Sequence, residues 1–507
     1  MPPRSPKRRW ITWPRIAFAL KAFAVFMMVA MPLAGVWIAS SLAAYASGPV
    51  WAAVLAGALV FPVLPAAWEI VARLRRARAI ARGAPARAPI LTTTDRMILR
   101  TLLLSTIFVG GLLATYPETA FAALATRGDW MLGGRRCGGW STARRALLGT
   151  ANTFAWVYEI THDHPYRELE GDRPPPPHGS GDALPIATAE DGARAGDGPD
   201  TEAPHDDDAH AVRRTEDGKP LWPLPKTLHP AIASVPADAE RNVDALGAYI
   251  QSSESDPFLR AKAVHDWIAD RIAYDVKAYR TGKYPSQDAE TVFQTRQGVC
   301  SGYSLLFVAL AKAAGVDAVL VAGDARTEGD DVRGEGHAWN AVRIDGAYYL
   351  VDATWDAGSV DGDDFKKGFG TDYLFTPPEV FGLTHFPDQD GWQLRDHPID
   401  RGEFFRQPMM APAFFASGYR LVEPDRSQVE ATGSVSIRAT NPSHAFFTGR
   451  VTPEGAAEAT ECGVTSEEDA TLLCPLGDRG RYHVELFTNR ARYGHYEYAG
   501  QVWVNAR

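Results

Sequence analysis

Apolar residues gather in three long runs near the N-terminus of the chain. The runs cover about residues 16–46, 50–71 and 97–124, and each reaches the roughly 20 residues that an α-helix needs to cross a bilayer. A basic N-terminus precedes the first run, and the segment RLRRARAIARGAPAR follows the second. Because Lys and Arg gather on the cytoplasmic side of membrane proteins, both segments are expected there. The pattern predicts three transmembrane helices, after which the chain lies outside the cytoplasmic membrane.

Other interpretations of this region stay open. A cleaved signal peptide would explain the small residues of SSLAAYASG, but the first run is longer than a signal-peptide core and a second run follows at once, which favours a membrane anchor. Residues 140–160 have an amphipathic pattern that predicts a helix on the membrane surface or against the third span. Arg144, Arg145 and Asn152 disfavour a fourth crossing, which would return the rest of the chain to the cytoplasm. The membrane flanks of the arginine-rich segment disfavour nucleic acid as a partner.

The pattern changes after residue 166. Residues 167–220 are rich in Pro, Gly, Asp, Ala and Glu and hold too few apolar side chains to fold, which predicts a disordered tether. Residues 256–278 place apolar side chains at helical spacing, which predicts a core helix with His265 on its solvent face. Beyond about residue 410, short alternating segments between turn residues predict a β-sandwich of roughly a hundred residues.

Candidate chemistry lies between these regions, around Cys300. Gly298 precedes the cysteine, and Gly315 ends the apolar run at helical spacing that follows it, so Cys300 is predicted at a helix N-terminus. There, unpaired backbone N–H groups and the positive end of the helix dipole favour a thiolate, the nucleophilic form of cysteine. The same N–H groups can stabilise an oxyanion.

Two further residues have the types that a cysteine nucleophile needs. The segment VDAVLVAGD predicts a strand, and His337 begins a second strand, HAWNAVRI. Asp345 and Gly346 are a strong hairpin signal, so the next strand returns antiparallel and brings Asp352 beside His337. A carboxylate bonded to one imidazole nitrogen leaves the other nitrogen to take the thiol proton. The prediction is a triad of Cys300, His337 and Asp352.

The segments GVCSGYS, GHAWN and DATWD resemble the three motifs of the transglutaminase-like superfamily, in the same order. The resemblance covers roughly residues 225–400. It looks closest to the bacterial and kyphoscoliosis-peptidase-like branch, because DYLFTPPEVFGLTHFPDQDGWQL resembles the segment that follows the core there. It implies an α+β, papain-like fold in which a nucleophile helix packs on an antiparallel sheet. It also implies that Cys300 is the nucleophile, His337 the general base and acid, and Asp352 the residue that orients the imidazole.

Other candidate residues rest on weaker signals. Tyr274, in the IAYD segment before the cysteine, is a candidate oxyanion donor by the same resemblance, and a core tyrosine is the alternative. Trp339, Trp355 and Asp356 lie near the histidine and the aspartate, and we expect them to line the substrate cleft. The acidic loop 357–370 lacks the spacing of an EF-hand, and HDHP and HDDDAH are polar tracts, so neither a metal nor another cofactor is expected.

Charge divides the chain in two. Through Glu170 there are 20 Lys and Arg against 8 Asp and Glu, and after it there are 32 against 53. A basic anchor therefore carries an acidic remainder. Of the four cysteines, Cys462 and Cys474 lie in the β-rich tail and can pair in an oxidising compartment, which the sequence leaves open, and Cys137 has no assigned role.

Together these observations predict a membrane-anchored enzyme that transfers an acyl group, or hydrolyses an amide or peptide bond, through a thioester on Cys300. Its expected substrates are proteins or peptides of the cell envelope, and the alternative is a non-catalytic envelope scaffold with the same domains. Oligomeric state and calcium dependence stay open. The predicted domains are a membrane anchor over 1–130, a membrane-proximal amphipathic helix over 131–166, a disordered linker over 167–220, a catalytic domain over 221–408 and a β-sandwich over 409–507.

Overall fold

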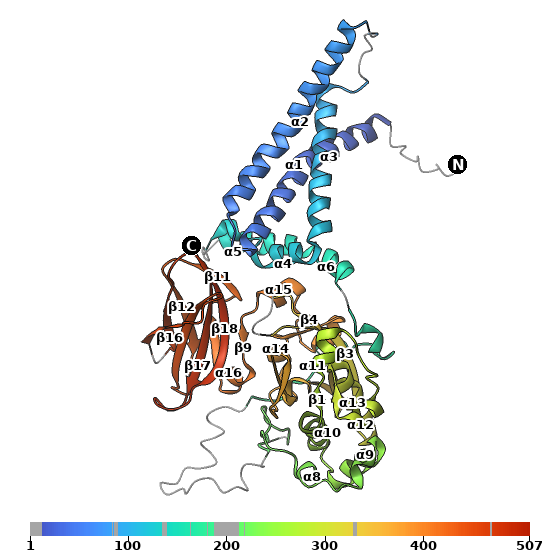
Figure 1. Ribbon diagram of the computed structural model, residues 1–507, viewed down its shortest axis with the longest axis vertical. Coiled ribbons are helices and arrows are strands. Elements are labelled where there is room, and N and C mark those ends of the chain that lie inside the picture. Colours follow the sequence, from blue (N-terminus) through green and yellow to red (C-terminus); the bar gives the residue numbers. More distant parts are fainter. Residues whose placement is uncertain are drawn as a thin grey trace, which may run out of the picture. The chain divides into compact units, whose positions relative to one another are not determined.

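The computed structural model divides the chain into two compact units, residues 1–162 and residues 163–507. Figure 1 shows the chain coloured along its sequence. Each unit has a buried core of its own. The structure describes residues 13–83, 85, 90–133, 139–162, 164–179, 181–186, 212–216, 218–327, 332–466 and 469–507.

The first unit consists of helices. Three of them are long and apolar enough to cross a membrane, by length and composition, as predicted. The Glu69 carboxylate of the second helix accepts hydrogen bonds from Arg73, Arg96 and Arg100, so this acidic group is paired with three basic ones. The three helices are α1 (Trp13–Tyr45), α2 (Val50–Ala81) and α3 (Thr93–Thr115).

Shorter helices complete the first unit. The amphipathic helix expected over 140–160 is two helices, because the helical hydrogen bonding stops at Asn152 and resumes at Ala155. The Arg144 side chain, which interrupts the apolar pattern, donates to the Asp129 carboxylate at 2.7 Å. The elements are α4 (Pro117–Arg127), η1 (Trp130–Leu132), α5 (Gly139–Asn152) and α6 (Ala155–Thr161).

The second unit is built around a four-stranded antiparallel sheet with the strand order β5-β4-β3-β8. As predicted, the turn at Asp345 and Gly346 joins β4 to β5. Both turn residues have a positive φ, 51° and 89°, which is the backbone conformation of a tight two-residue hairpin. The strands are β3 (Asp317–Ala325), β4 (Glu335–Ile344), β5 (Ala347–Val351) and β8 (His385–Pro387).

Helix α13 (Cys300–Ala313) packs against β3 and β4. Two buried polar side chains join the helix to the sheet. Ser304 donates to the carbonyl of Ala338 at 3.0 Å, and Asn340 donates to the carbonyls of Ser304 and Val319 at 3.1 and 3.2 Å. Because buried polar groups lose free energy when unpaired, these bonds fix the position of α13 on the sheet.

Further helices surround α13 (Figure 1) and share one hydrophobic core with it. The core helix expected over 256–278 begins as predicted but ends at Arg271, and β1 begins at Ala273. The remaining elements of this region are η2 (Arg167–Leu169), α8 (Pro230–Ala233), η4 (Ala239–Arg241), α9 (Val243–Ser253), α10 (Pro257–Arg271), β1 (Ala273–Tyr274), α11 (Val276–Thr281), α12 (Ala289–Thr295), β2 (Gln297–Gly298), η5 (Trp355–Ala357), β6 (Gly358–Asp361), β7 (Asp364–Lys367), α14 (Pro378–Phe381), η6 (Asp390–Gln393) and α15 (Arg401–Arg406).

The structure corrects the tether predicted over 167–220 at the start of that range. Leu184 is buried in the core of the sheet domain, and Gly181 forms a β-bridge with Tyr348 of β5. The Tyr349 hydroxyl donates to the Asp182 carboxylate at 3.1 Å. The described residues from 167 to 186 are therefore bound to the sheet domain, because their side chains find apolar and polar partners there. Residues 187–211 lie outside the described residues.

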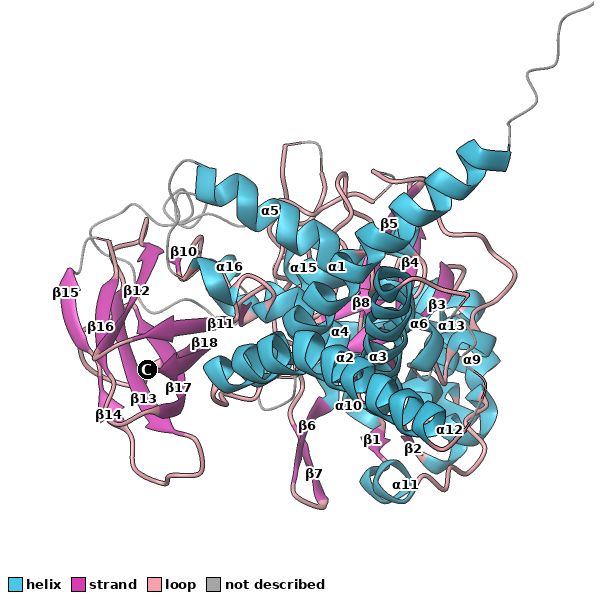
Figure 2. Ribbon diagram, turned by 90° about the horizontal axis from the view of Figure 1, so that it is seen from above, coloured by secondary structure: helices cyan, strands magenta, loops and turns pink. Residues whose placement is uncertain are grey.

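The C-terminal region is a β-sandwich, as predicted (Figure 2). One sheet has the order β10-β12-β16-β15 and the other β11-β18-β17-β13-β14, and side chains from both form a single core. Cys462 and Cys474 are joined by a disulfide. The elements are β9 (Met409–Met410), α16 (Pro412–Ala416), β10 (Arg420–Glu423), β11 (Gln428–Ala431), β12 (Ser434–Thr440), β13 (Phe446–Pro453), β14 (Thr460–Glu461), β15 (Gly463–Ser466), β16 (Thr471–Pro475), β17 (Gly480–Asn489) and β18 (Glu497–Ala506).

Buried arginines connect the sheet domain to the segment that leads into the sandwich. Arg326, just after β3, is fully buried and donates to the carbonyls of Phe405 and Gln407. Arg401 of α15 is paired with the buried Asp324 of β3. Strand β9, which follows α15, pairs with β18 of the sandwich. The segment from α15 to β9 therefore contacts both the end of β3 and strand β18 of the sandwich.

Candidate active site

Cys300 is the first residue of α13, as predicted. Its side chain is only 3% exposed but lines a cavity of about 680 Å³. Val299 is the N-cap and provides no side-chain cap, and its own N–H donates to the Gln287 side chain at 2.9 Å. The backbone N–H groups at the start of a helix carry partial positive charge, which favours a thiolate at this position. The sulfur is thus buried at a helix N-terminus, with an opening on one side.

His337 and Asp352 meet beside this cavity. The imidazole Nε2 of His337 lies 2.8 Å from Oδ2 of Asp352, in a hydrogen bond that both residues bury. The other carboxylate oxygen accepts the backbone N–H groups of Thr354 and Trp355 at 2.8 and 3.3 Å. With Nε2 bonded to the carboxylate, Nδ1 is the nitrogen left for the thiol. The side chains of His337 and Cys300 line the same cavity, and Cys300 is one of the groups that raise the pKa of His337.

The charges of this group stabilise one another. Burial lowers the pKa of His337, but the Asp352 carboxylate and the Cys300 side chain outweigh it and raise that pKa to about 10. Burial raises the pKa of Asp352, but the His337 and His385 side chains hold it well below its usual range. At neutral pH the arrangement favours an imidazolium beside the sulfur, which is the partner that a thiolate requires.

A second histidine, His385, binds the same carboxylate. Its Nε2 lies 3.1 Å from Oδ2 of Asp352, and its Nδ1 lies 2.9 Å from the Thr384 hydroxyl. Burial lowers the pKa of His385 to about 4, so the ring is neutral and its one proton is placed where it donates to Asp352. The ring is stacked on Phe381, with the centroids 4.0 Å apart. His385 therefore holds the aspartate and stays uncharged.

The two histidines and the aspartate also have the composition of a metal site. The nitrogen atoms of His337 and His385 and an oxygen of Asp352 all lie within 4.8 Å of one another. Both nitrogens already face the carboxylate in hydrogen bonds. Because these bonds satisfy both rings and the carboxylate, the arrangement is explained as a hydrogen-bonded trio and needs no ion.

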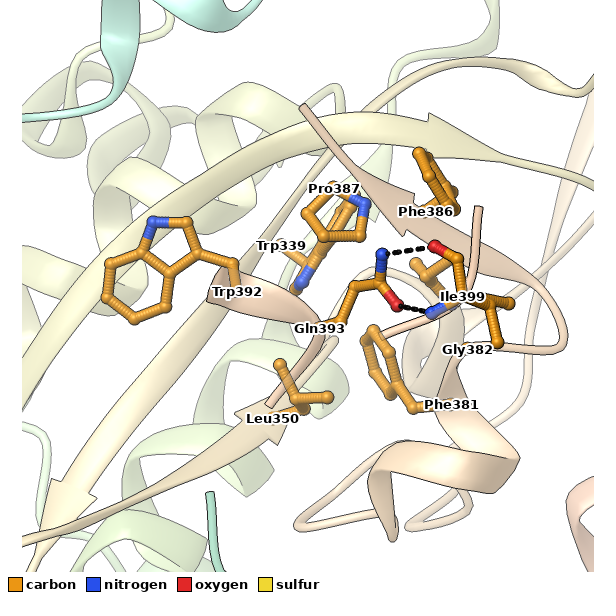
Figure 3. Close-up of a pocket in the computed structure, with 10 residues that line it drawn as sticks. Trp339, Leu350, Phe381, Gly382, Phe386, Pro387, Trp392, Gln393 and Ile399 are labelled. Atoms are coloured by element: carbon orange, nitrogen blue, oxygen red, sulfur yellow. Dashed lines mark hydrogen bonds between the residues drawn. The ribbon is translucent and has the colours of Figure 1, made fainter. Parts of the chain in front are cut away.

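The predicted oxyanion donor Tyr274 and the predicted cleft residues do not all lie at the cavity. Tyr274 and Trp355 line the cavity together with Cys300. Trp339 does not, which corrects the expectation for this residue: it is 1% exposed and packs inside the sheet domain against Phe381 and other buried side chains. Figure 3 shows it in that interior. The alternation along β4 places it on the same face as His337, and its ring lies 6.0 Å from the His337 ring between centroids. Buried residues of the segment after β5 pack against it there.

Residues 244–353, which include all three predicted triad residues, match the family model of the transglutaminase-like superfamily. The chain therefore contains a transglutaminase-like domain.

Relatives of this transglutaminase-like domain are found among animal proteins. Kyphoscoliosis peptidase from Mus musculus is 32% identical over 202 residues, which are 38% of this chain and 30% of that protein. Kyphoscoliosis peptidase from Homo sapiens is 30% identical over 198 residues, 37% of this chain and 30% of that protein. The predicted similarity to this branch is confirmed, and the chain spans about 30% of the length of these relatives.

Among solved structures, the periplasmic domain of TgpA from Pseudomonas aeruginosa is 20% identical. The similarity covers 27% of this chain and 52% of that chain, with a TM-score of 0.19.

Two features of the transglutaminase-like domain differ from the sequence prediction. His265, expected on the solvent face of α10, is fully buried, with Nδ1 3.0 Å from Asp266 and Nε2 3.1 Å from Asp356. Asp356, expected in the cleft wall, also accepts the backbone N–H groups of Asp372 and Tyr373 at 3.0 and 2.9 Å. The helical pattern missed this because α10 is buried on nearly all sides.

Sequence reasoning also missed His385, which lies 33 residues after Asp352. The signal was present, since the THFP segment lies inside the stretch that resembles the kyphoscoliosis-peptidase-like branch. Its contact with Asp352 depends on strand β8 pairing with β3, opposite to the side where β4 pairs, and a three-residue strand gives no periodicity from which to predict that.

Proposed function

We propose that this protein is a membrane-anchored, transglutaminase-like cysteine enzyme that acts on protein or peptide amides through a Cys300–His337–Asp352 triad. The observation that carries the proposal is the His337–Asp352 pair beside Cys300, with the sulfur at the start of α13 and at the wall of an open cavity. A buried histidine that a carboxylate holds beside a cysteine is the arrangement that activates a thiol nucleophile.

The reaction proceeds in two halves. The Cys300 thiolate attacks the carbonyl carbon of a carboxamide or peptide, and the oxygen becomes an oxyanion beside the N-terminal N–H groups of α13. His337, as imidazolium, gives its proton to the departing ammonia or amine as the C–N bond breaks, which leaves a thioester on Cys300. A second nucleophile then loses a proton to His337 and releases the acyl group. Tyr274 lines the cavity at Cys300 and is proposed as a further oxyanion donor.

The second nucleophile decides the outcome. An amine such as a lysine side chain yields a new amide and makes the enzyme a cross-linker, whereas water yields hydrolysis and makes it a protease or amidase. The triad is the same for both. Trp355, Tyr274 and Phe365 give the cavity an aromatic wall, which suits an extended peptide more than a small polar substrate.

The location that we propose is the cytoplasmic membrane, with the transglutaminase-like domain outside the cytoplasm. The three candidate spans and the arginine-rich segment between the second and third support this orientation. The disulfide between Cys462 and Cys474 supports it independently, because such bonds persist in oxidising compartments. Proteins or peptides of the envelope are then the accessible substrates.

The test is mass spectrometry of the full chain in detergent, offered glutamine-containing peptides with and without a primary amine. We expect a product heavier by the amine, or a cleaved or deamidated peptide, and we expect Cys300→Ser and Asp352→Asn to lower the rate at least a hundredfold. Asp361→Asn, at an exposed position of the β6–β7 hairpin, is the matched control and should keep full activity.

The opposite outcome has a clear form. If wild-type protein leaves every peptide unchanged and Cys300→Ser has no effect in cells that depend on the protein, the domain is a binding scaffold and the enzymatic proposal is wrong.

A further inference from the structure

The segment from residue 164 to residue 170 lies where the predicted membrane-proximal helix meets the predicted linker, before the region predicted as the catalytic domain, yet it is bound across that domain's sheet. At one end, His164 and Arg167 both pair with Asp388, at 2.7 and 3.2 Å. At the other end, Glu170 accepts the backbone N–H of Ala322 at 2.8 Å and the Gln389 side chain at 2.6 Å. The Asp388 side chain is 1% exposed, so this attachment is a buried one.

The middle of the 164–170 segment reaches the catalytic cysteine. Pro165 packs against Gly336, which precedes His337, so closely that a β-carbon at Gly336 would lie 2.8 Å from the proline ring. Tyr166 packs on Leu320, Ala322 and Ala338 of the sheet. Tyr166 lines the same cavity as Cys300, and the two side chains interact closely enough that Cys300 raises the pKa of the Tyr166 hydroxyl.

Tyr166 lines the side of the cavity at Cys300 and does not fill it. The cavity that Tyr166 lines measures about 680 Å³ and is also bounded by Trp355 and Tyr274, so the phenol leaves the approach to the sulfur open. A phenol O–H donates to a thiolate, and charge-assisted hydrogen bonds of this kind favour the ionised partner. Burial, and then the charge of Cys300, raise the pKa of Tyr166, so the hydroxyl keeps its proton over the whole neutral range.

We propose that Tyr166 is a catalytic residue: it donates a hydrogen bond to the Cys300 thiolate, and the 164–170 segment forms one wall of the substrate cleft. The inference rests on the proposed role of Cys300 as the nucleophile. It places a functional part of the active site before the domain boundary that the sequence pattern predicts, and outside the 244–353 stretch that matches the superfamily.

The experiment measures how fast iodoacetamide labels Cys300 in the full chain as a function of pH. The thiolate sulfur displaces iodide and forms a carbon–sulfur bond, so the rate follows the fraction of thiolate. A Cys137→Ser background leaves Cys300 as the only cysteine outside the disulfide, and mass spectrometry reads the modified peptide.

We expect Tyr166→Phe to move the midpoint of the labelling profile upward by about one pH unit. At pH values below both midpoints, labelling should then be about tenfold slower, because one pKa unit is a factor of ten in ionisation. Tyr249→Phe is the matched control. Tyr249 lies in α9 and does not line the cavity, and its hydroxyl donates to the Ala231 carbonyl of α8 at 3.1 Å, so its profile should match the wild type. Asp388→Asn weakens the attachment of the 164–170 segment to Asp388 but keeps the Tyr166 phenol, so it should shift the midpoint in the same direction by less. This variant tests the inference if Tyr166→Phe does not fold.

Two results would overturn the inference. Unchanged labelling in Tyr166→Phe would mean that the phenol does not stabilise the thiolate, and faster labelling would mean that it shields the sulfur. Failure of the proposed function looks different, because wild-type Cys300 would then label no faster than the urea-denatured chain.

Discussion

At the scale of single residues, Asp352 is the centre of the site because it holds two histidines in different charge states. The Asp352 carboxylate and the Cys300 side chain act on His337 and outweigh the effect of burial, so its pKa rises to about 10. His385 touches the same oxygen but is enclosed by Phe381, Trp339 and Trp355, and burial lowers its pKa to about 4. One ring is thus suited to carry the moving proton, and the other to orient the carboxylate.

This division of roles predicts the effect of His385→Phe. Phenylalanine keeps the aromatic packing but removes the donor to Asp352, and a hydrogen bond to a charged group contributes about 1.5–3 kcal/mol. We expect kcat/KM on a peptide substrate to fall about tenfold or more. His385→Gln, whose amide can still donate, should recover part of the loss. Equal losses in both variants, with equal thermal stability, would mean that Asp352 does not depend on this donor.

At the scale of elements, the start of α13 is shaped by a side chain from the loop before α12. The Gln287 Oε1 atom accepts the N–H of Val299, and a β-carbon at Gly302 would lie 2.4 Å from that same oxygen. Gly302 therefore leaves the space in which Gln287 holds the N-terminus of the nucleophile helix. Gly302 has ordinary helical backbone angles, so a glycine is needed here because the Gln287 side chain lies too close for a β-carbon and not because of the backbone conformation.

The contact predicts that Gly302→Ala and Gln287→Ala are coupled. The single change Gly302→Ala should lower the free energy of unfolding by about 1–3 kcal/mol, because it displaces the Gln287 side chain. In the double variant the clash is gone. Its loss of unfolding free energy should therefore be about 1 kcal/mol smaller than the sum of the losses in the two single variants. Urea unfolding measures all three variants, and strict additivity would contradict the proposed contact.

At the scale of the whole molecule, the triad makes stability depend on pH. The pKa of His337 is about 10 in the folded protein and near 6.5 in an unfolded chain. Between these values the folded state binds a proton that the unfolded state lacks, so the stabilisation is complete below about pH 6.5 and is lost as the pH rises through about 10. For Asp352 the sign is opposite: its lowered pKa stabilises the fold above about pH 4, and this is lost as the pH falls.

We therefore expect the melting temperature of the chain to decline between pH 7 and pH 10, and the decline to be smaller in His337→Gln. Differential scanning fluorimetry at fixed ionic strength measures both. His495→Gln, at an exposed position of the sandwich, is the control and should follow the wild type. Parallel curves for wild type and His337→Gln would show that the histidine is not charged in the folded state.

The sequence by itself predicted the elements whose signals are local. Three apolar runs became three long helices, the glycine-flanked cysteine began a helix, and the Asp-Gly turn set the register of β4 and β5. Two strands joined by a tight turn can pair in few ways, so the closeness of His337 and Asp352 followed from chain order alone. The alternating pattern after residue 410 likewise predicted a sandwich.

Tertiary structure alone decided which distant residues complete the site. His385 reaches Asp352 because β8 pairs with β3, and Tyr166 reaches Cys300 because charged groups attach its segment to Asp388 and Ala322. Likewise, Trp339 is buried because the chain after β5 covers it. These contacts join segments far apart in the chain, and no local periodicity encodes them, because they depend on which surfaces remain uncovered once the sheet has formed.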